Sequence, residues 1–303
     1  MAAINYVTHF ETRIREMYGH DLVSVDLFNS NSDLQVNGAQ EIKIPTLTVG
    51  GYKDHVRTKI GFNAGTFSNN FETKKLDHDR DIEFAIDPMD VDETNQIVSI
   101  ANIQKRFEET QAIPELDCYT FSKIFSELKR VKADNIKETV INEANVLSDF
   151  DANCEAFENA GVPLSRCILY CTPAYKRILK NAQGITRIMN VDGNGVVNRA
   201  IHSMDDLGKI VTVPVDRFKT AYDFTDGFKV SGSNGKQINY ILIDPEAQVS
   251  RVKYSYINVY NPGSDSRCAD NYLYQNRRYN GTFAIDTLLA HGCIINAETG
   301  AKS

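Results

Sequence analysis

Apolar and polar residues begin to alternate regularly after residue 40. Residues 42–49 have the composition of a strand, and in residues 81–86 the apolar Ile82, Phe84 and Ile86 take every second position. A period of two is typical of a half-buried strand. The pattern therefore predicts two strands, with a long polar stretch between them.

Residues 50–87, which include this polar stretch, have too few apolar residues for a core of their own. Up to Asp81 they are Tyr52, Val56, Ile60, Phe62, Ala64, Phe67, Phe71 and Leu76. If the stretch folds back as a two-stranded ribbon, each arm has about 16 residues and reaches about 50 Å. A compact body of this length has a radius of gyration of only about 19 Å.

Such a ribbon needs a support outside its own domain. An isolated two-stranded hairpin is marginally stable in water. We therefore expect another copy of the same chain to hold it.

A helix-rich region follows the ribbon. Acidic and cap-forming residues cluster at 87–94, where they complement the positive end of a helix expected over residues 93–112. Pro114 is expected to interrupt that helix. A second helix follows, since Phe121, Ile124, Phe125 and Leu128 have the spacing of a core-facing stripe.

The remaining elements are predicted from shorter patterns. A third helix runs from about Val140 to Phe157 and is stopped at residues 161–163, and a helix beginning at Pro173 runs to about Asn181. Near the N-terminus we expect a helix over residues 7–18 and an extended polar segment over 29–38. The expected strands are residues 167–171, 210–215, 239–243, 252–260 and 283–295.

Composition and charge narrow the class of protein. The chain has 303 residues, 33 basic against 40 acidic, a net charge of −7 and 42% hydrophobic residues. These values are ordinary for a globular protein and argue against an electropositive face that must attract nucleic acid. No apolar run approaches the length of about 20 residues that spans a bilayer, so no membrane partner is expected.

The six cysteines are scattered and include no CxxC pair. On a strand, Cys167 and Cys171 would lie about 13 Å apart, beyond the reach of a disulfide. We expect free thiols and no zinc site.

One enzymatic reading starts from Asp77, Asp79 and Asp81, which would lie on one side of a strand and could hold a divalent cation. Lys74, Lys75 or Arg80 could instead neutralise them. The histidines occur singly, and neither a phosphate loop nor a GxSxG motif is present. We therefore expect no catalytic, cofactor or metal residues and no enzymatic activity.

Taken in order, several short segments resemble the major capsid protein of tailed bacteriophages with the Hong Kong 97-type fold. They are residues 38–45, 52–57, 61–62, 72–73, 76, 79–80, 84, 87, 89–94 and 114–119, and then 206–218, 243–247, 278–279 and 283. No single segment is specific, but their order is, and the resemblance covers nearly the whole chain.

The resemblance implies an α+β subunit with five parts. These are an N-terminal arm (1–41), an extended E-loop hairpin (42–87), a long spine helix with the peripheral domain (88–139), an axial domain (140–235), and returning strands that complete both domains (236–303). The helix expected over residues 93–112 corresponds to the spine helix. The E-loop would lie over a neighbouring subunit, with Arg57, Phe62 and Arg80 as intersubunit contacts.

The resemblance further implies a structural protein that assembles as hexamers and pentamers into an icosahedral shell. That shell would enclose double-stranded DNA without sequence-specific binding, with portal and scaffolding proteins as partners. The protein would belong to the virion capsid and assemble in the cytoplasm of the host bacterium. Two alternatives are an encapsulin-like nanocompartment shell and a metal-dependent hydrolase using Asp77, Asp79 and Asp81.

Overall fold

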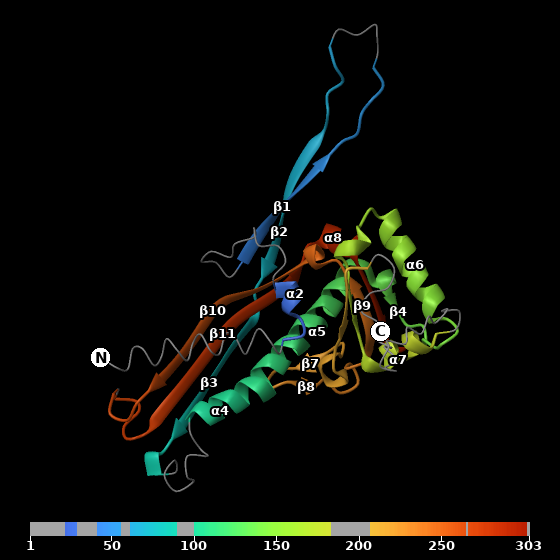
Figure 1. Ribbon diagram of the computed structural model, residues 1–303. Coiled ribbons are helices and arrows are strands. Elements are labelled where there is room, and N and C mark those ends of the chain that lie inside the picture. The colour runs from blue at the N-terminus through green and yellow to red at the C-terminus, as the bar shows by residue number, and fades with distance from the viewer. Residues whose placement is uncertain are drawn as a thin grey trace, which may run out of the picture.

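The computed structural model describes residues 22–28, 41–55, 61–89, 100–182, 207–264 and 266–301. The helix expected over residues 7–18 and the polar segment 29–38 lie outside these ranges, as does the acidic turn beyond Met89. A body of two sheets and several helices carries one long hairpin that projects away from it (Figure 1).

A long helix runs through the body and contacts both sheets. It consists of α4 (Ile100–Phe107), the π-helical segment Glu108–Ala112 and α5 (Ile113–Lys132), which follow one another without a break. Pro114 therefore does not interrupt the helix, contrary to the prediction. A proline lacks the N–H that an α-helix needs, and the wider π-helical turn just before it takes up that irregularity.

The helical stripe predicted on α5 is confirmed. Phe121, Ile124, Phe125 and Leu128 are all buried and pack in one hydrophobic cluster against a five-stranded sheet. The strand order in that sheet is β4 (Ile136–Lys137), β12 (Cys293–Ala297), β9 (Ile238–Ile243), β5 (Ile168–Cys171) and β6 (Lys209–Thr212).

The opposite face of the five-stranded sheet is covered by α6 (Val146–Asn159) and α7 (Pro173–Asn181). Along β9, Ile241 and Ile243 face the α5 side, whereas Tyr240 and Leu242 face α6 and α7. Burial on both faces explains why this strand is an uninterrupted apolar run. α6 begins later than predicted, and the exposed Val140 lies before it.

A second, three-stranded antiparallel sheet lies against the first half of the long helix. Its order is β10 (Gln248–Tyr260), β11 (Tyr272–Ala284) and β3 (His78–Ile86). The alternation predicted on β3 is confirmed, because exposed residues alternate with buried or half-buried ones along it. A small hairpin, β7 (Tyr222–Asp223) and β8 (Lys229–Val230), packs beside α5.

The strand predicted over residues 283–295 is wrong. β11 ends at Ala284, α8 occupies Asp286–Gly292, and β12 begins at Cys293. Asp286 lies in the first turn of α8, where a carboxylate is favoured by the helix dipole. The segment was predicted as one strand, and this short helix within it supplies an anchor for the hairpin.

The N-terminal part of the described chain is fastened to the long helix. α2 (Val25–Phe28) follows Ser24, whose N–H and hydroxyl both donate to Asp117 Oδ1, at 3.1 and 2.8 Å. Arg217 Nη1 donates to the other carboxylate oxygen at 3.2 Å. Asp117 is fully buried, so this small network holds residues 22–28 against α5.

All six cysteines are free, as predicted, and all except Cys154 are buried. Burial raises the pKa of the Cys171 thiol to about 11, which keeps it protonated. Within the described residues, no helix is both long enough and apolar enough to cross a bilayer.

Candidate assembly interface

The projecting hairpin is the candidate interface. β1 (Glu41–Val49) pairs with β2 (Phe67–Lys75), in register from Glu41 opposite Lys75 to Val49 opposite Phe67. One more backbone hydrogen bond joins Gly50 to Thr66 at 2.7 Å. Beyond it the two arms separate and point away from the body (Figure 1).

The predicted ribbon exists but is shifted along the chain. It comprises residues 41–75 rather than 50–87, because β3 leaves the hairpin and joins the three-stranded sheet. Its arms still have about the predicted length. The strand predicted over residues 42–49 is thus part of one arm of the ribbon, not a separate strand that precedes the ribbon.

The outer part of the hairpin exposes apolar side chains with no cover from its own subunit. Their exposed fractions are Leu47 67%, Val49 68%, Tyr52 110%, Phe62 93% and Phe67 79%. Burying a large apolar side chain is worth roughly 1.5 to 3 kcal/mol. This strip therefore gains substantially from contact with another surface.

The separated arms enclose an open space of about 590 Å³. Its walls include Val49, Tyr52, Phe62 and Ala64. The Asn63 amide bridges the arms by donating to the carbonyl oxygen of Asp54 at 2.7 Å. This end of the hairpin thus presents two aromatic rings that border an open space between the arms.

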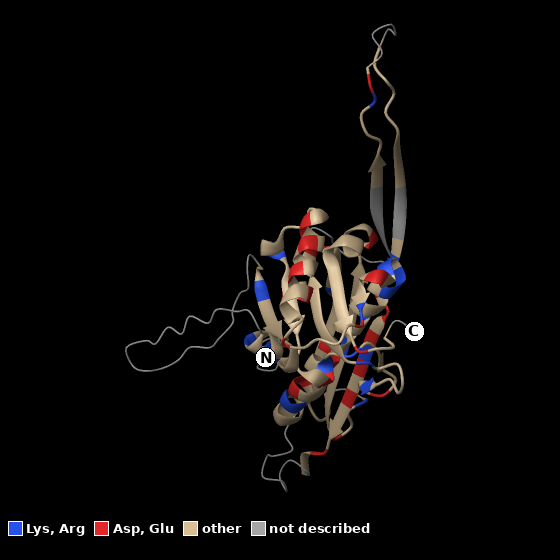
Figure 2. Cartoon of the chain, turned by 90° about the vertical axis from the view of Figure 1, so that its right-hand side faces the viewer, with Lys and Arg blue, Asp and Glu red and all other residues tan. Residues whose placement is uncertain are grey.

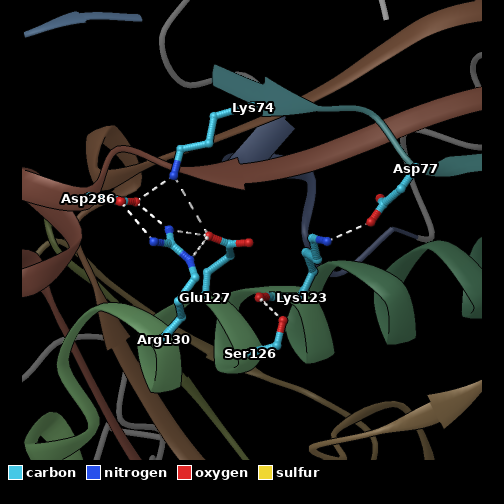
Figure 3. A network of polar contacts seen from close by, with 7 residues as sticks. All are labelled: Lys74, Asp77, Lys123, Ser126, Glu127, Arg130 and Asp286. Carbon is cyan, nitrogen blue, oxygen red and sulfur yellow. Dashed lines mark hydrogen bonds and ion pairs between the residues drawn. The ribbon is translucent and has the colours of Figure 1, made fainter. Parts of the chain in front are cut away.

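Ion pairs hold the base of the hairpin against the body. Lys74 Nζ lies 2.5 Å from Asp286 Oδ1, and Arg130 donates to both oxygens of Asp286, at 2.6 and 2.9 Å. Arg130 also contacts Glu127 Oε2 at 2.7 Å. Two cations and two carboxylates thus join β2, α5 and α8 (Figure 3). They set the direction in which the hairpin leaves the body.

The network predicts a pH-dependent stability. Burial opposes the charge of Asp286, but hydrogen bonds from Arg130 and Lys74 outweigh it and lower the pKa of Asp286 below its ordinary value of 3.8. A lowered folded-state pKa stabilises the fold above the unfolded pKa, and this contribution is lost as the pH falls through the folded value. We expect Asp286→Asn to reduce the free energy of unfolding at neutral pH by about 2 kcal/mol.

Denaturant titration of both proteins from neutral to acid pH tests this. The difference from wild type should begin to shrink below about pH 4, where Asp286 of the unfolded chain becomes protonated. It should disappear only at a still lower pH, once the pH has fallen through the lowered folded-state pKa. Asp134→Asn, at an exposed carboxylate near the end of α5, is the control and should change little. A difference that stays constant with pH would contradict the electrostatic origin.

An apolar contact fixes the corner between β2 and β3. Leu76 is 5% exposed and packs with Val249 and Phe283, and its carbonyl oxygen accepts a hydrogen bond from the Tyr279 hydroxyl at 2.8 Å. A Cβ at Gly281 would lie 1.9 Å from Leu76 Cδ2. Gly281 therefore makes room for the side chain that ends the hairpin.

We expect Gly281→Ala to destabilise the subunit by about 1 to 3 kcal/mol through this overlap. Thermal unfolding of the variant measures the loss. Leu76→Ala has a cavity cost of its own, but in that background Gly281→Ala should cost less than it does in the wild type, because the smaller side chain removes the overlap. The same cost of Gly281→Ala in both backgrounds would disprove this explanation.

Asp77 and Asp79, two of the three carboxylates in the metal hypothesis, are held by basic residues of the same subunit. Asp77 Oδ2 accepts from Lys123 Nζ at 2.6 Å, and Asp79 Oδ2 accepts from Arg277 Nη2 at 2.6 Å. The Arg277 hydrogen bond lowers the pKa of Asp79. In the part of the chain that is described, no three His, Cys, Asp or Glu side chains are placed to share a metal ion. The arrangement does not favour the hydrolase.

The three predicted contact residues lie in different settings. Phe62 is exposed on the outer hairpin, whereas Arg57 lies outside the described residues. Arg80 turns into its own subunit, where Nε donates to Glu115 Oε1 at 2.7 Å and the other nitrogens donate to the carbonyl oxygens of Phe224 and Gly227. Contact of these residues with a neighbour stays a prediction.

Sequence reasoning missed the residues that anchor the hairpin. Lys74 and Asp286 are 212 positions apart, and neither stands in a recognisable motif. Among the exposed aromatic residues, the sequence predicts only Phe62 as a contact, and Tyr52 and Phe67 are counted only as scattered apolar residues of a polar stretch. The anchors could have been found only by knowing that α8 lies beside the base of the hairpin.

Neither the protein-family models nor the curated protein sequences gave a match to the chain. The comparison with solved structures gave matches. The "Asymmetric unit of bacteriophage PhiM1 mature capsid" matches with a TM-score of 0.63 and 13% identity, covering 87% of this chain and 83% of the other. The "Capsid structure of the Cyanophage P-SCSP1u" has a TM-score of 0.57 and 10% identity over 87% and 85%.

A chain from Mycobacterium phage Ogopogo matches over more of both lengths, 91% of this chain and 92% of the other, with a TM-score of 0.56 and 14% identity. At such identities the likeness establishes the fold. The chain therefore has the α+β fold of these phage capsid structures, as the sequence predicted.

Proposed function

We propose that the chain is the major capsid protein of a tailed bacteriophage, and that its copies form the icosahedral shell around a double-stranded DNA genome. One observation carries the proposal. A hairpin anchored by four charged residues and by Leu76 holds an uncovered apolar strip away from its own body. A subunit built in this way gains stability when a second copy covers the strip.

The phage capsid structures support the proposal through their fold, which matches along nearly the whole chain. In the proposed subunit, the hairpin of residues 41–75 serves as the E-loop and residues 100–132 serve as the spine helix. Residues 140–235 form the axial domain, and residues 236–303 return to complete both domains. Phe62 and Arg57 contact a second copy.

The charge of the chain suits a container that does not bind its contents tightly. The net charge is −7, and Figure 2 shows basic and acidic residues interspersed on the displayed face of the body rather than gathered into a basic one. A protein that neutralises many phosphates holds nucleic acid strongly. We infer a wall that encloses DNA without sequence-specific contacts, in a virion whose hexamers and pentamers assemble with scaffolding and portal proteins.

Electron microscopy of the expressed protein tests the proposal. We expect closed shells tens of nanometres across, and particles from an infected host should protect double-stranded DNA from nuclease. Shells that carry protein cargo and no nucleic acid would favour the encapsulin-like alternative. A protein that stays monomeric under all assembly conditions would contradict both.

A further inference from the structure

The register of the hairpin fixes which backbone groups lie on its outer edges. Among the described residues, β1 and β2 pair only with each other. The Gly50 N–H donates to the carbonyl oxygen of Thr66, the residue directly opposite, and the register is unbroken from there to the base. Bonded and unbonded pairs alternate in an antiparallel hairpin. The even-numbered residues therefore bond across the hairpin, and the odd-numbered residues direct their N–H and C=O groups outward.

Proline and charge interrupt the outer edge of β1. Its outward positions include Pro45, which has no N–H to donate, and the charged Glu41 and Lys43. Natural proteins use proline and charged residues to keep an edge strand from pairing with another chain. This edge is therefore poorly suited to a third strand.

The outer edge of β2 has none of these features along most of its length. Its outward positions are Phe67, Asn69, Phe71 and Thr73, which are uncharged and all carry an N–H. Successive outward positions lie about 6.8 Å apart, so the four extend over about 20 Å. Four donors and four acceptors in a row form a template on which another strand can pair.

The other edge strands of the subunit are protected. β10 contains a bulge between Val252 and Tyr254, and exposed carboxylates occupy three alternate positions of β3. β4 and β6, the edges of the five-stranded sheet, have only two and four residues. Bulges, charges and short length all limit pairing at an edge. The open edge is thus particular to β2 among the edges of these larger sheets.

An added strand has to come from outside the described body. The hairpin points away from that body in two views at right angles, and no described segment lies beside its outer half (Figures 1 and 2). A two-stranded hairpin is marginally stable by itself, whereas three strands can form a stable sheet. The hairpin therefore gains order when a further strand pairs with β2.

We propose that the outer edge of β2 accepts an extended segment of a second copy, which pairs through backbone hydrogen bonds at residues 67–73. The occupant is a second copy because this edge begins at Phe67, which is 79% exposed and belongs to the apolar strip of the candidate assembly interface. Backbone bonds provide affinity in strand addition, and alternate side chains provide specificity. This inference rests on the proposed function.

Hydrogen exchange measured at single amides, in free subunits and in assembled shells, tests the strand addition. In the free subunit, the amides of Phe67, Asn69, Phe71 and Thr73 should exchange rapidly, because their N–H groups point into water. In shells they should exchange at least about tenfold more slowly. The outward amide of Lys43 on the β1 edge is the internal control and should stay fast in both.

Asn69→Pro removes one outward N–H from β2 and leaves the bonds within the hairpin intact. We expect the subunit concentration needed for assembly to rise about tenfold, because a backbone hydrogen bond is lost at every copy. Lys43→Pro makes the same change on the β1 edge, and Asn69→Ala removes the side chain but keeps the N–H. Both controls should assemble like the wild type. The exchange measurement on the wild type remains decisive if Asn69→Pro folds poorly.

A reconstruction of the shell identifies the added strand. A strand of a second copy about 4.8 Å from β2 is the expected result. A strand of the same copy or of a different protein at this edge would overturn the inference. Rapid exchange of the four amides in intact shells, or assembly of Asn69→Pro at the wild-type concentration, would also overturn it. Shells form in each of these cases, so the proposed function would stand, whereas a wild type that forms no shells would contradict the proposed function itself.

Discussion

Replacing Tyr52 and Phe62 together by serine is expected to abolish shell assembly and to leave the subunit as stable as before. Both rings are almost fully exposed in the subunit, so the free energy of unfolding should change by less than about 0.5 kcal/mol. Aromatic anchors buried at an interface are worth about 2 kcal/mol or more each. In a closed shell this loss recurs at every copy, and the effect on assembly is therefore large.

Sedimentation and electron microscopy measure the outcome. The matched control exchanges the rings, Tyr52→Phe with Phe62→Tyr, which keeps the aromatic surface and should still assemble. Normal shells from the serine variant would show that the exposed strip is not an interface. Loss of stability in the serine variant would show instead that the rings support their own subunit.

The second large effect is expected at Asp117. Burial raises the pKa of its carboxyl, although hydrogen bonds from Ser24 and the charge of Arg217 oppose this. Asp117→Ala leaves the Ser24 N–H and hydroxyl and the Arg217 guanidinium without their acceptor. Removing one partner of a buried charged network costs about 3 to 5 kcal/mol, so we expect a loss of that size.

Urea denaturation of the variant measures this loss. Asp117→Asn keeps one acceptor for Ser24 and should lose less. Asp134→Ala removes an exposed carboxylate near the end of the same helix and should change stability by less than about 0.5 kcal/mol. If Asp117→Ala behaved like Asp134→Ala, the network would not hold residues 22–28 in place.

The sequence was most informative where a pattern has one physical cause. Ile82 and Phe84 alternate because one face of β3 packs toward the long helix, and Phe121 and Leu128 share a stripe because one side of α5 is buried. The lack of apolar residues after Val49 correctly indicated a ribbon without a core. Each of these signals is local to its own segment.

Most of the errors arose where distant residues decide the outcome. The ribbon ends at Lys75 because Leu76 fits beside Gly281, and no local pattern marks that contact. The error at Pro114 has a local cause instead, because the π-helical turn directly before it accommodates the ring. The anchor between Lys74 and Asp286 depends on the position of α8, a seven-residue helix inside a segment that was predicted as one strand.

The most direct test is a reconstruction of the assembled particle at a resolution that traces the hairpin. We expect residues 41–75 of each copy to lie on a second copy, with Tyr52 and Phe62 buried at the contact. A particle in which each hairpin folds back on its own subunit and touches no other copy would contradict the proposed role of the hairpin.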